Sequence, residues 1–247
     1  MLLSLGLFVC GLCLGSFLSA TANRVEKKIS NWHGRSFCSH CHRKLTTVDL
    51  IPVFSFIFLR GRCRTCQKPI GWREPAAELA TGLAFLTVGL VHNGTIDLLL
   101  IRDLVLTIFL ILLFLIDIYH GLLPHRFTIT ATIVALAFNL TPLNPSLHPS
   151  TPLNLLTGMI ICGGFFYLQH LISRGRWVGG GDIGMGLFLG AALGLWYGLW
   201  ALGLAYILGA LVAVVLLATK KMTMKSAMPF GPFLAVAGWV VLIFFRG

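Results

Sequence analysis

Two aspartates lie at the ends of long apolar segments in a chain of 247 residues that has only eight Asp and Glu. Asp117 follows the apolar run of residues 104–116, and Asp182 lies between a run of three glycines and another apolar run. Because an ionised carboxylate is costly near lipid, two of them in matching positions indicate shared chemistry. Neighbouring carboxylates share a proton, so one can deprotonate water while the other polarises a peptide carbonyl. The pair therefore predicts aspartyl hydrolysis, with Asp117 and Asp182 as catalytic residues.

Each aspartate taken alone has a simpler interpretation. Asp117 could be an interfacial polar residue in a turn, and Asp182 could be a helix N-cap after the glycine turn. The glycines could also let backbone approach an extended substrate, which makes Gly179 and Gly181 candidate substrate-binding residues. The occurrence of both aspartates at one membrane level favours a function over two separate structural roles.

Four cysteines in a polar loop have the spacing of a metal site. Cys38 and Cys41 form one C-x2-C pair, and Cys63 and Cys66 form a second pair after 21 residues. This pattern is typical of a tetrahedral zinc site, which is structural because four thiolates leave no open coordination position. Three nearby histidines could replace a cysteine as ligand: His33, His40 and His42.

The elements that must position these residues are membrane helices. Hydrophobic residues make up 57% of the chain, charged residues 11%, and the mean hydropathy is +0.87. A soluble domain of this size could not bury so much apolar surface, so we expect an all-α, polytopic membrane protein. About eight transmembrane helices are predicted, at residues 2–21, 76–92, 98–116, 127–140, 153–172, 183–195, 197–219 and 232–245. Residues 2–21 lack a basic start and a clear cleavage site, so we expect a retained helix and not a cleaved leader.

The lysines and arginines predict the orientation of these helices. Eleven of the nineteen fall in residues 22–75, and six more fall in loops on the same side. By the positive-inside rule this side is cytoplasmic. Both candidate catalytic aspartates then lie at cytoplasmic helix ends, whereas Asp103 lies about 21 Å from Asp117 along one helix. The net charge of +11 is thus a topology signal, and we expect a lipid bilayer and no nucleic acid as partner.

Three parts are expected along the chain: a first membrane helix (1–21), a cytoplasmic basic cysteine loop (22–75) and a transmembrane catalytic core (76–247). Residues 50–59 are apolar enough to give the loop a small core or a membrane-dipping hairpin. Asp49 is expected to be solvated, and Asp97 to cap the third span. Glu78 lies deep enough to bind substrate, although pairing with Arg73 explains its position equally well.

The motifs, taken in order, resemble those of type IV prepilin peptidases, the membrane aspartyl proteases of pilus and type II secretion systems. The resemblance implies that Asp117 and Asp182 cleave the basic leader of a prepilin or pseudopilin at the cytoplasmic face of the bacterial inner membrane. It also implies N-methylation with S-adenosylmethionine, although the chain has no glycine-rich dinucleotide-type loop. The matching motifs are Gly11-Leu-Cys-Leu-Gly15 with Asn23-Arg24, the cysteine loop with Glu78, Asp117 with Leu122-Leu123-Pro124, Gly179-Gly180-Gly181-Asp182, and Pro229-Phe-Gly-Pro.

Two positions depart from the family pattern. His125 stands where the family usually has Asp, and Gly184 stands where it usually has Lys. Both departures leave open a catalytically weak, divergent homologue. The chain could instead be a preflagellin or presenilin-like protease, or a proton- or ion-coupled transporter. The long cysteine loop argues against such a protease, and the position of both aspartates at helix ends argues against a transporter.

Overall fold

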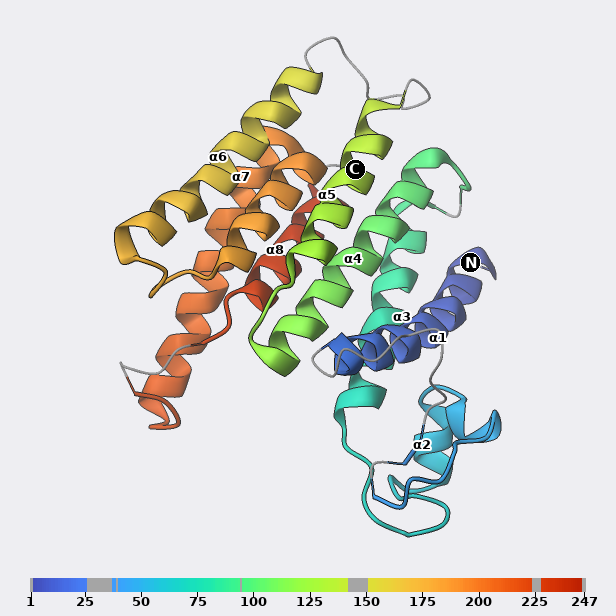
Figure 1. The fold of residues 1–247 in the computed structure, drawn as a ribbon. Helices are drawn as coiled ribbons and strands as arrows, with labels where there is room; N and C mark the ends of the chain where they lie inside the picture. The colour runs from blue at the N-terminus through green and yellow to red at the C-terminus, as the bar shows by residue number, and fades with distance from the viewer. Residues whose placement is uncertain are drawn as a thin grey trace. The chain divides into compact units, whose positions relative to one another are not determined.

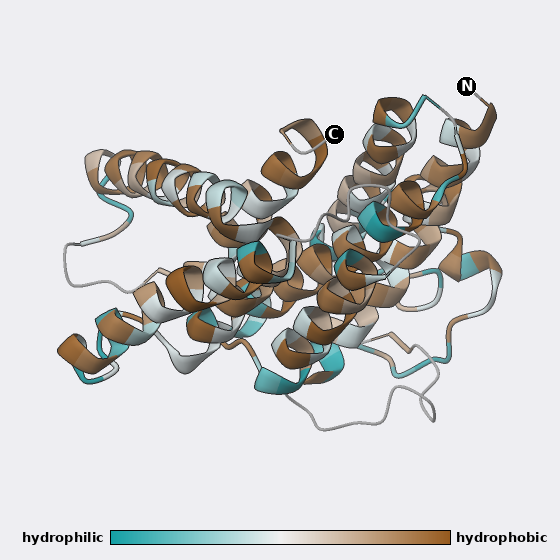
Figure 2. Ribbon diagram, turned by 90° about the horizontal axis from the view of Figure 1, so that it is seen from above, coloured by the Kyte–Doolittle hydropathy of each residue, from teal (hydrophilic) through white to brown (hydrophobic). Residues whose placement is uncertain are grey.

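The computed structural model describes residues 2–25, 37–38, 40–93, 95–141, 151–223 and 228–245. Within these ranges the regular elements are helices, accompanied by two isolated β-bridges. Residues 1–95 and residues 96–247 form two compact units (Figure 1). Hydrophobic residues dominate the helices (Figure 2). The prediction of an all-α, apolar protein is confirmed.

The first unit contains a closely packed helix pair and the cysteine loop. Its elements are α1 (Leu2–Val25), η1 (Val48–Leu50), α2 (Phe54–Phe58) and α3 (Arg73–Val91). Helices α1 and α3 pack along each other. A Cβ added at Gly15 would lie 2.7 Å from the Cα of Glu78, and one at Gly11 would lie 2.8 Å from the carbonyl oxygen of Thr81. The two glycines therefore let the backbones approach closely, as small residues do between membrane helices.

The second unit contains α4 (Leu98–His120), α5 (His125–Leu140), α6 (Thr151–Ser173), α7 (Gly180–Ala218) and α8 (Gly231–Phe244). Helix α7 packs against α5, α6 and α8, and α4 packs against α5 and α8. The predicted cap of α4 is confirmed, because Asp97 Oδ1 accepts a hydrogen bond from Leu100 N–H at 2.8 Å. Helix α4 ends at Gly121, whose φ of 64° is the left-handed conformation that glycine adopts without strain.

Helix α7 folds back on itself at Gly194, which has a non-helical φ of 76° and ψ of −169°. A Cβ added at Gly198 would lie 3.9 Å from the Cα of Gly190. In a straight helix, residues eight positions apart are separated by about 12 Å. Residues 180–193 and 195–218 are therefore two antiparallel arms, drawn in shades of orange in Figure 1.

The turn at Gly194 interrupts the backbone hydrogen bonds of α7, and two asparagines bond to backbone groups beside it. Asn139 of α5 is fully buried, and its Nδ2 donates to the carbonyl oxygens of Ala191 at 2.8 Å and Ala192 at 3.2 Å. Asn154 Oδ1 of α6 accepts a hydrogen bond from Leu195 N–H at 3.1 Å. Because unpaired backbone groups are costly in an apolar environment, these side chains stabilise the hairpin.

Among the described residues, five helices are long and apolar enough to cross a membrane: α1, α3, α4, α6 and α7. Helices α5 and α8 are shorter, with 16 and 14 residues. When the two arms of α7 are counted separately, each of the eight predicted spans falls on a helical segment. The predicted division at residues 21/22 and 75/76 stays a prediction.

Candidate functional site

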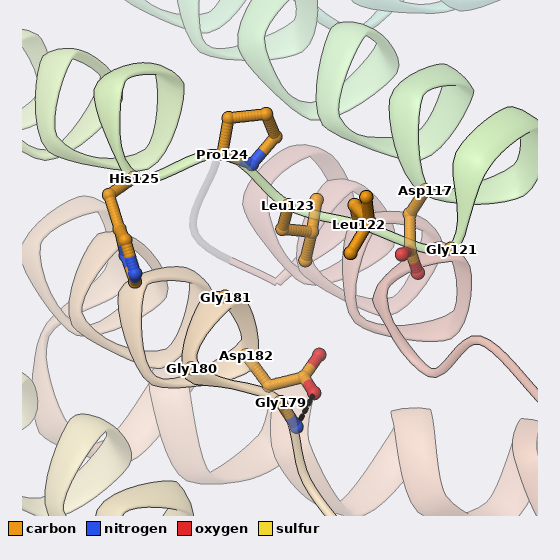
Figure 3. A pocket seen from close by; sticks show the side chains of 10 residues that line it. All are labelled: Asp117, Gly121, Leu122, Leu123, Pro124, His125, Gly179, Gly180, Gly181 and Asp182. Carbon is orange, nitrogen blue, oxygen red and sulfur yellow. Dashed lines mark hydrogen bonds between the residues drawn. The ribbon is translucent and has the colours of Figure 1, made fainter. Parts of the chain in front are cut away.

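The two predicted catalytic aspartates lie at the ends of two helices that border one pocket. Asp117 is in the last turn of α4, and Asp182 is the third residue of α7. Both line a pocket of about 420 Å³, together with residues 121–125 and 179–181. Figure 3 shows both carboxyl groups pointing into this space. The structure thus brings together two carboxylates that lie far apart in the sequence.

Asp182 is held by the backbone at the start of α7. Its Oδ2 accepts a hydrogen bond from Gly179 N–H at 3.1 Å, and its own N–H donates to Gly179 O at 3.2 Å. This reciprocal pair resembles a capping box, and the helix dipole favours negative charge at this end. The N-cap of α7 is Gly179 and not Asp182, which instead supports the helix start from its third position and uses only one of its two carboxylate oxygens.

Asp117 is more enclosed. Its side chain is buried, and Oδ2 has no hydrogen-bond partner among the described residues. Gly231, the first residue of α8, covers this oxygen so closely that an added Cβ would lie 2.5 Å away. A buried, unpaired carboxylate oxygen lowers stability, so its presence here favours a functional role.

The glycine turn before Asp182 packs against the connection between α4 and α5. A Cβ added at Gly181 would lie 2.5 Å from Leu123 Cβ and 2.7 Å from Leu123 O. The absent side chain at Gly181 therefore allows contact within the chain itself. A Cβ at Gly180 would lie 3.5 Å from His125 Cε1, which is an ordinary contact distance. Contact of Gly179 and Gly181 with a substrate stays a prediction.

An aromatic cluster holds the turn that covers Asp117. The Phe230 ring lies 4.8 Å from that of Tyr206, 6.1 Å from that of Phe166 and 6.3 Å from that of Phe233, measured between centroids. These rings come from α6, α7 and α8. The sequence indicated the Pro229-Phe-Gly-Pro turn, but the cluster could not be predicted because its members are distant in the chain.

The two departures from the family pattern lie beside the pocket. His125, the first residue of α5, is one of its lining residues. Gly184 faces α5, where an added Cβ would lie 2.5 Å from Thr128 Oγ1 and 2.9 Å from Thr128 Cβ. A larger side chain at position 184 would therefore need α5 to move. The sequence analysis named Leu123 in the motif of Asp117 and His125 as a departure from it, but it did not predict that both line one pocket.

The four cysteines of the loop meet in a geometry that fits a metal ion. Their sulfur atoms all lie within 4.8 Å of one another, and the Sγ atoms of Cys38 and Cys66 are 3.9 Å apart. A tetrahedron with Zn–S bonds of about 2.3 Å separates its sulfurs by about 3.8 Å. The donor set, Cys38, Cys41, Cys63 and Cys66, therefore fits zinc. His40 and His42 are outside this group, and His33 lies outside the described residues.

Two matching turns present the sulfurs in pairs. In the first turn His42 N–H donates to Cys38 O, and in the second Gln67 N–H donates to Cys63 O, each at 3.0 Å. His42 and Gln67 also share a left-handed conformation, with φ of 55° and 54°. The repeated C-x2-C spacing thus produces a repeated backbone turn.

Backbone N–H groups favour the thiolate form of two of these cysteines. Hydrogen bonding from the backbone of Cys66 is the largest cause that lowers the pKa of the Cys63 thiol, to about 6. The backbone of Cys41 similarly lowers the pKa of Cys38. Because metals bind the deprotonated thiol, these contacts favour coordination near neutral pH.

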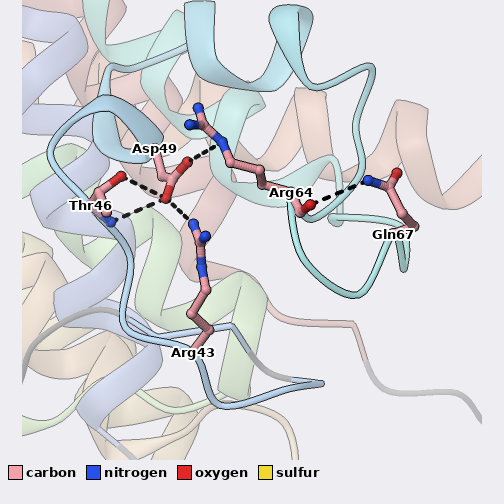
Figure 4. Close-up of polar contacts among 5 residues, drawn as sticks. All are labelled: Arg43, Thr46, Asp49, Arg64 and Gln67. Carbon is pink, nitrogen blue, oxygen red and sulfur yellow. Dashed lines mark hydrogen bonds and ion pairs between the residues drawn. The ribbon is translucent and has the colours of Figure 1, made fainter.

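Asp49 ties the two turns together (Figure 4). It pairs with Arg43 of the first turn and, at 3.3 Å, with Arg64 of the second, and it accepts two hydrogen bonds from Thr46. Desolvation by burial opposes its charge, but the Thr46 hydrogen bonds and both guanidinium groups keep the pKa of Asp49 below its usual range. The expectation of a solvated Asp49 is wrong, because its side chain is only 3% exposed.

Glu78 of α3 bonds to the cysteine loop within the first unit. Its side chain is buried, and Oε2 accepts a hydrogen bond from Val53 N–H at 2.7 Å. Val53 precedes α2 and has a φ of 60°, which is unusual for a β-branched residue. The Glu78 carboxylate thus holds a strained turn of the cysteine loop against α3. Its predicted contact with substrate stays a prediction.

Known proteins match nearly the whole chain. Residues 9–92 match the bacterial peptidase A24 N-terminal domain, and residues 104–214 match the type IV leader peptidase family. A prepilin leader peptidase/N-methyltransferase of Aeromonas hydrophila is 34% identical over 85% of this chain and 71% of its own length. Its counterpart in Bacillus subtilis (strain 168) is 32% identical over 98% of this chain and 93% of its own.

A third relative is the type 4 prepilin-like proteins leader peptide-processing enzyme of Escherichia coli O78:H11, which is 31% identical over 93% of this chain and 90% of its own length. No solved structure matches the chain significantly. The order of the two matched domains and the nearly full-length similarity agree with the pocket and the cysteine cluster described above. The chain belongs to the type IV leader peptidase family.

Proposed function

We propose that this chain is a membrane-embedded aspartyl peptidase that cleaves the leader of a prepilin or pseudopilin. The observation that carries the proposal is the single pocket lined by both Asp117 and Asp182. The family and the names of its relatives support the substrate class. Such a substrate has a short basic leader, a glycine at the cleavage site and a hydrophobic helix.

Asp182 acts as the base in this proposal. It lies at the favourable end of a helix dipole and already accepts a backbone hydrogen bond, so it is suited to carry the negative charge. Asp117 carries the shared proton and donates it to the scissile carbonyl oxygen. Asp182 takes a proton from water, and the resulting hydroxide oxygen attacks the carbonyl carbon.

The tetrahedral intermediate then collapses as the C–N bond breaks. Asp182 returns its proton to the leaving amine, and Asp117 regains a proton from the hydroxyl group of the intermediate. Both carboxyl groups end in their starting states, so the pair is ready for another cycle. These steps use only the two carboxyl groups and water, and the cysteine cluster is a separate site.

The membrane position of the pocket suits this substrate. Asp117 and Asp182 lie at ends of apolar helices, so a substrate helix in the bilayer would bring its cleavage site to the same level. The concentration of Lys and Arg in the adjoining loops supports a cytoplasmic position for this end, in the bacterial inner membrane.

The four cysteines support a bound zinc, whereas only the relatives' names support the use of S-adenosylmethionine. We infer a structural zinc at the four cysteines, because four thiolates fill its coordination. Methylation of the new N-terminus is inferred from the relatives' names alone. The pocket is lined by the two carboxylates, His125, Leu122, Leu123, Pro124 and glycines, and we assign none of them to S-adenosylmethionine.

The test is cleavage of a co-expressed prepilin, followed by mass spectrometry of its N-terminus. Asp117→Asn and Asp182→Asn each remove one acid–base group, so we expect cleavage rates to fall by at least about 10²–10⁴-fold. Asp97→Asn makes the same change at the cap of α4, away from the pocket, and should cleave normally. Normal cleavage by either pocket variant at equal protein level would contradict the proposed mechanism.

A further inference from the structure

Helix α2 presents an apolar face that the described parts of the chain leave uncovered. Phe58 is 83% exposed, Ile57 64% and Phe54 56%. Their spacing of three and four residues places them on one side of the helix. We propose that this α2 face inserts into the boundary between headgroups and acyl chains of an anionic phospholipid bilayer.

The orientation of α2 is fixed by a residue on its opposite side. The Phe56 ring lies 4.8 Å from the Trp72 ring, and a Cβ added at Gly61 would lie 3.1 Å from Phe56 Cζ. Phe56 therefore provides the small core of the loop. The α2 face is left pointing outward because the helix cannot rotate without breaking this contact.

A hydrogen bond fixes the start of α2 to α3. Val53, directly before α2, donates its N–H to Glu78 Oε2 at 2.7 Å. Glu78 lies about 8 Å along α3 from the start of that helix, which is long and apolar enough to cross a membrane. On α3 the exposed leucines begin at this level, with Leu79 at 44% and Leu83 at 48%. The hydrogen bond to Glu78 therefore holds the start of α2 at the level of α3 where these exposed leucines begin.

The charges around α2 favour anionic lipid as the occupant. Three exposed cations follow the helix closely in the sequence: Arg60, Arg62 and Lys68. Arg64 is also exposed, but it pairs with Asp49 at 3.3 Å and is therefore not counted with them. An apolar helix face bordered by cations is the combination that binds at the surface of anionic membranes.

Photo-crosslinking of the full chain in liposomes tests this contact. p-Benzoylphenylalanine is placed at Phe58 or, in a second variant, at Ile57, and adducts are identified by mass spectrometry. Leu211, 60% exposed on α7, serves as a lipid-facing reference, and Gln67, exposed on the second cysteine turn, as a polar control. We expect lipid adducts at Phe58 and Ile57 comparable to those at Leu211 and several-fold above those at Gln67.

Lipid composition provides the second arm of the experiment. Replacing part of the phosphatidylcholine with phosphatidylglycerol should raise the adduct yield at Phe58 several-fold. It should leave the yield at Leu211 unchanged, because the cation that follows Leu211 in the chain, Lys220, lies nine residues or about 14 Å further along. Crosslinks from Phe58 and Ile57 to protein instead of lipid would overturn the proposal. So would lipid yields no higher than at Gln67 in a sample that gives normal adducts at Leu211.

Discussion

Gly181 lies directly against Leu123, and this contact sets the distance between the start of α7 and the end of α4. Gly181→Ala would place a Cβ 2.5 Å from Leu123 Cβ and 2.7 Å from its carbonyl oxygen, so the backbone must shift. A displacement of about 1 Å at a catalytic group can cost about 10²-fold in rate. We therefore expect kcat/KM for prepilin cleavage to fall by at least about tenfold in this variant.

Gly180→Ala is the matched control. Its Cβ would lie 3.5 Å from His125 Cε1, which needs no movement, so we expect nearly normal cleavage. Equal activities of the two alanine variants would show that the contact between Gly181 and Leu123 does not position the aspartates.

Asp49 offers a test of the metal site that leaves all four cysteines in place. Its pKa is lower in the folded protein than in the unfolded chain, so its stabilisation is present above about pH 4 and lost as the pH falls through the folded value. At pH 7, Asp49→Asn leaves Arg43 and Arg64 without their carboxylate. We expect about one equivalent of zinc in the purified wild type and several-fold faster release to a chelator from the variant.

Glu74→Gln removes a carboxylate from the same unit, but an exposed one, and should release zinc at the wild-type rate. A wild type with less than about half an equivalent of metal and four reduced cysteines would reject the zinc site. Equal release from the two variants would instead show that the Asp49 ion pairs do not hold the turns together.

At the residue scale, the sequence was most informative where chemistry depends on residue type and spacing. Asp117 and Asp182 stood out as costly charges, and the cysteines through their C-x2-C spacing. Asp49 was misjudged because its two arginines reach it from separate turns, and only the folded loop brings them together. The packing of Gly184 on Thr128 was equally hidden, since it joins α7 to α5.

At the scale of elements, the hairpin of α7 depends on side chains from two other helices. Asn139→Leu would remove the hydrogen bonds that the carbonyl groups of Ala191 and Ala192 accept from the buried Asn139. Losing such a partner costs about 1–3 kcal/mol, so we expect a lower free energy of unfolding in detergent micelles. Thr130→Val, an exposed change on the same helix, is the control. Equal stabilities of the two variants would contradict the role of Asn139.

Hydropathy predicted the helical segments well because each is long and apolar. It also predicted a break near residue 196, and the structure has it at Gly194. The five-residue α2 was beyond this approach, since such a short apolar run has no distinctive period. The capping of the α7 turn by Asn139 and Asn154 was also hidden, because it depends on how three helices pack.

At the scale of the whole molecule, the distribution of Lys and Arg predicts an orientation that reporter fusions can check. Alkaline phosphatase, which is active only outside the cytoplasm, should be active when fused after Thr95 or Thr141. It should be inactive after Arg62 or Lys221, because these positions lie in the basic loops that the positive-inside rule keeps in the cytoplasm. The opposite pattern of activities would reverse the proposed orientation.

Which helices are neighbours could not be predicted. Membrane helices are apolar on most sides, so no single stripe identifies the packed face. The pairing of α1 with α3 and of α6 with α7 rests on glycines that allow close approach, such as Gly15 and Gly190. Their meaning becomes apparent only when the partner helix is known.

The register between α6 and the first arm of α7 has a consequence for the supply of water. Gly190 packs on Gly158 and Gly186 on Cys162, so continuing the register places Asp182 level with Phe166. Helix α6 runs on to Ser173, about 10 Å further. The carboxylates are therefore recessed below the end of a neighbouring helix. Water must therefore reach Asp182 past this end of α6, and a substrate helix must unwind there to expose its peptide bond.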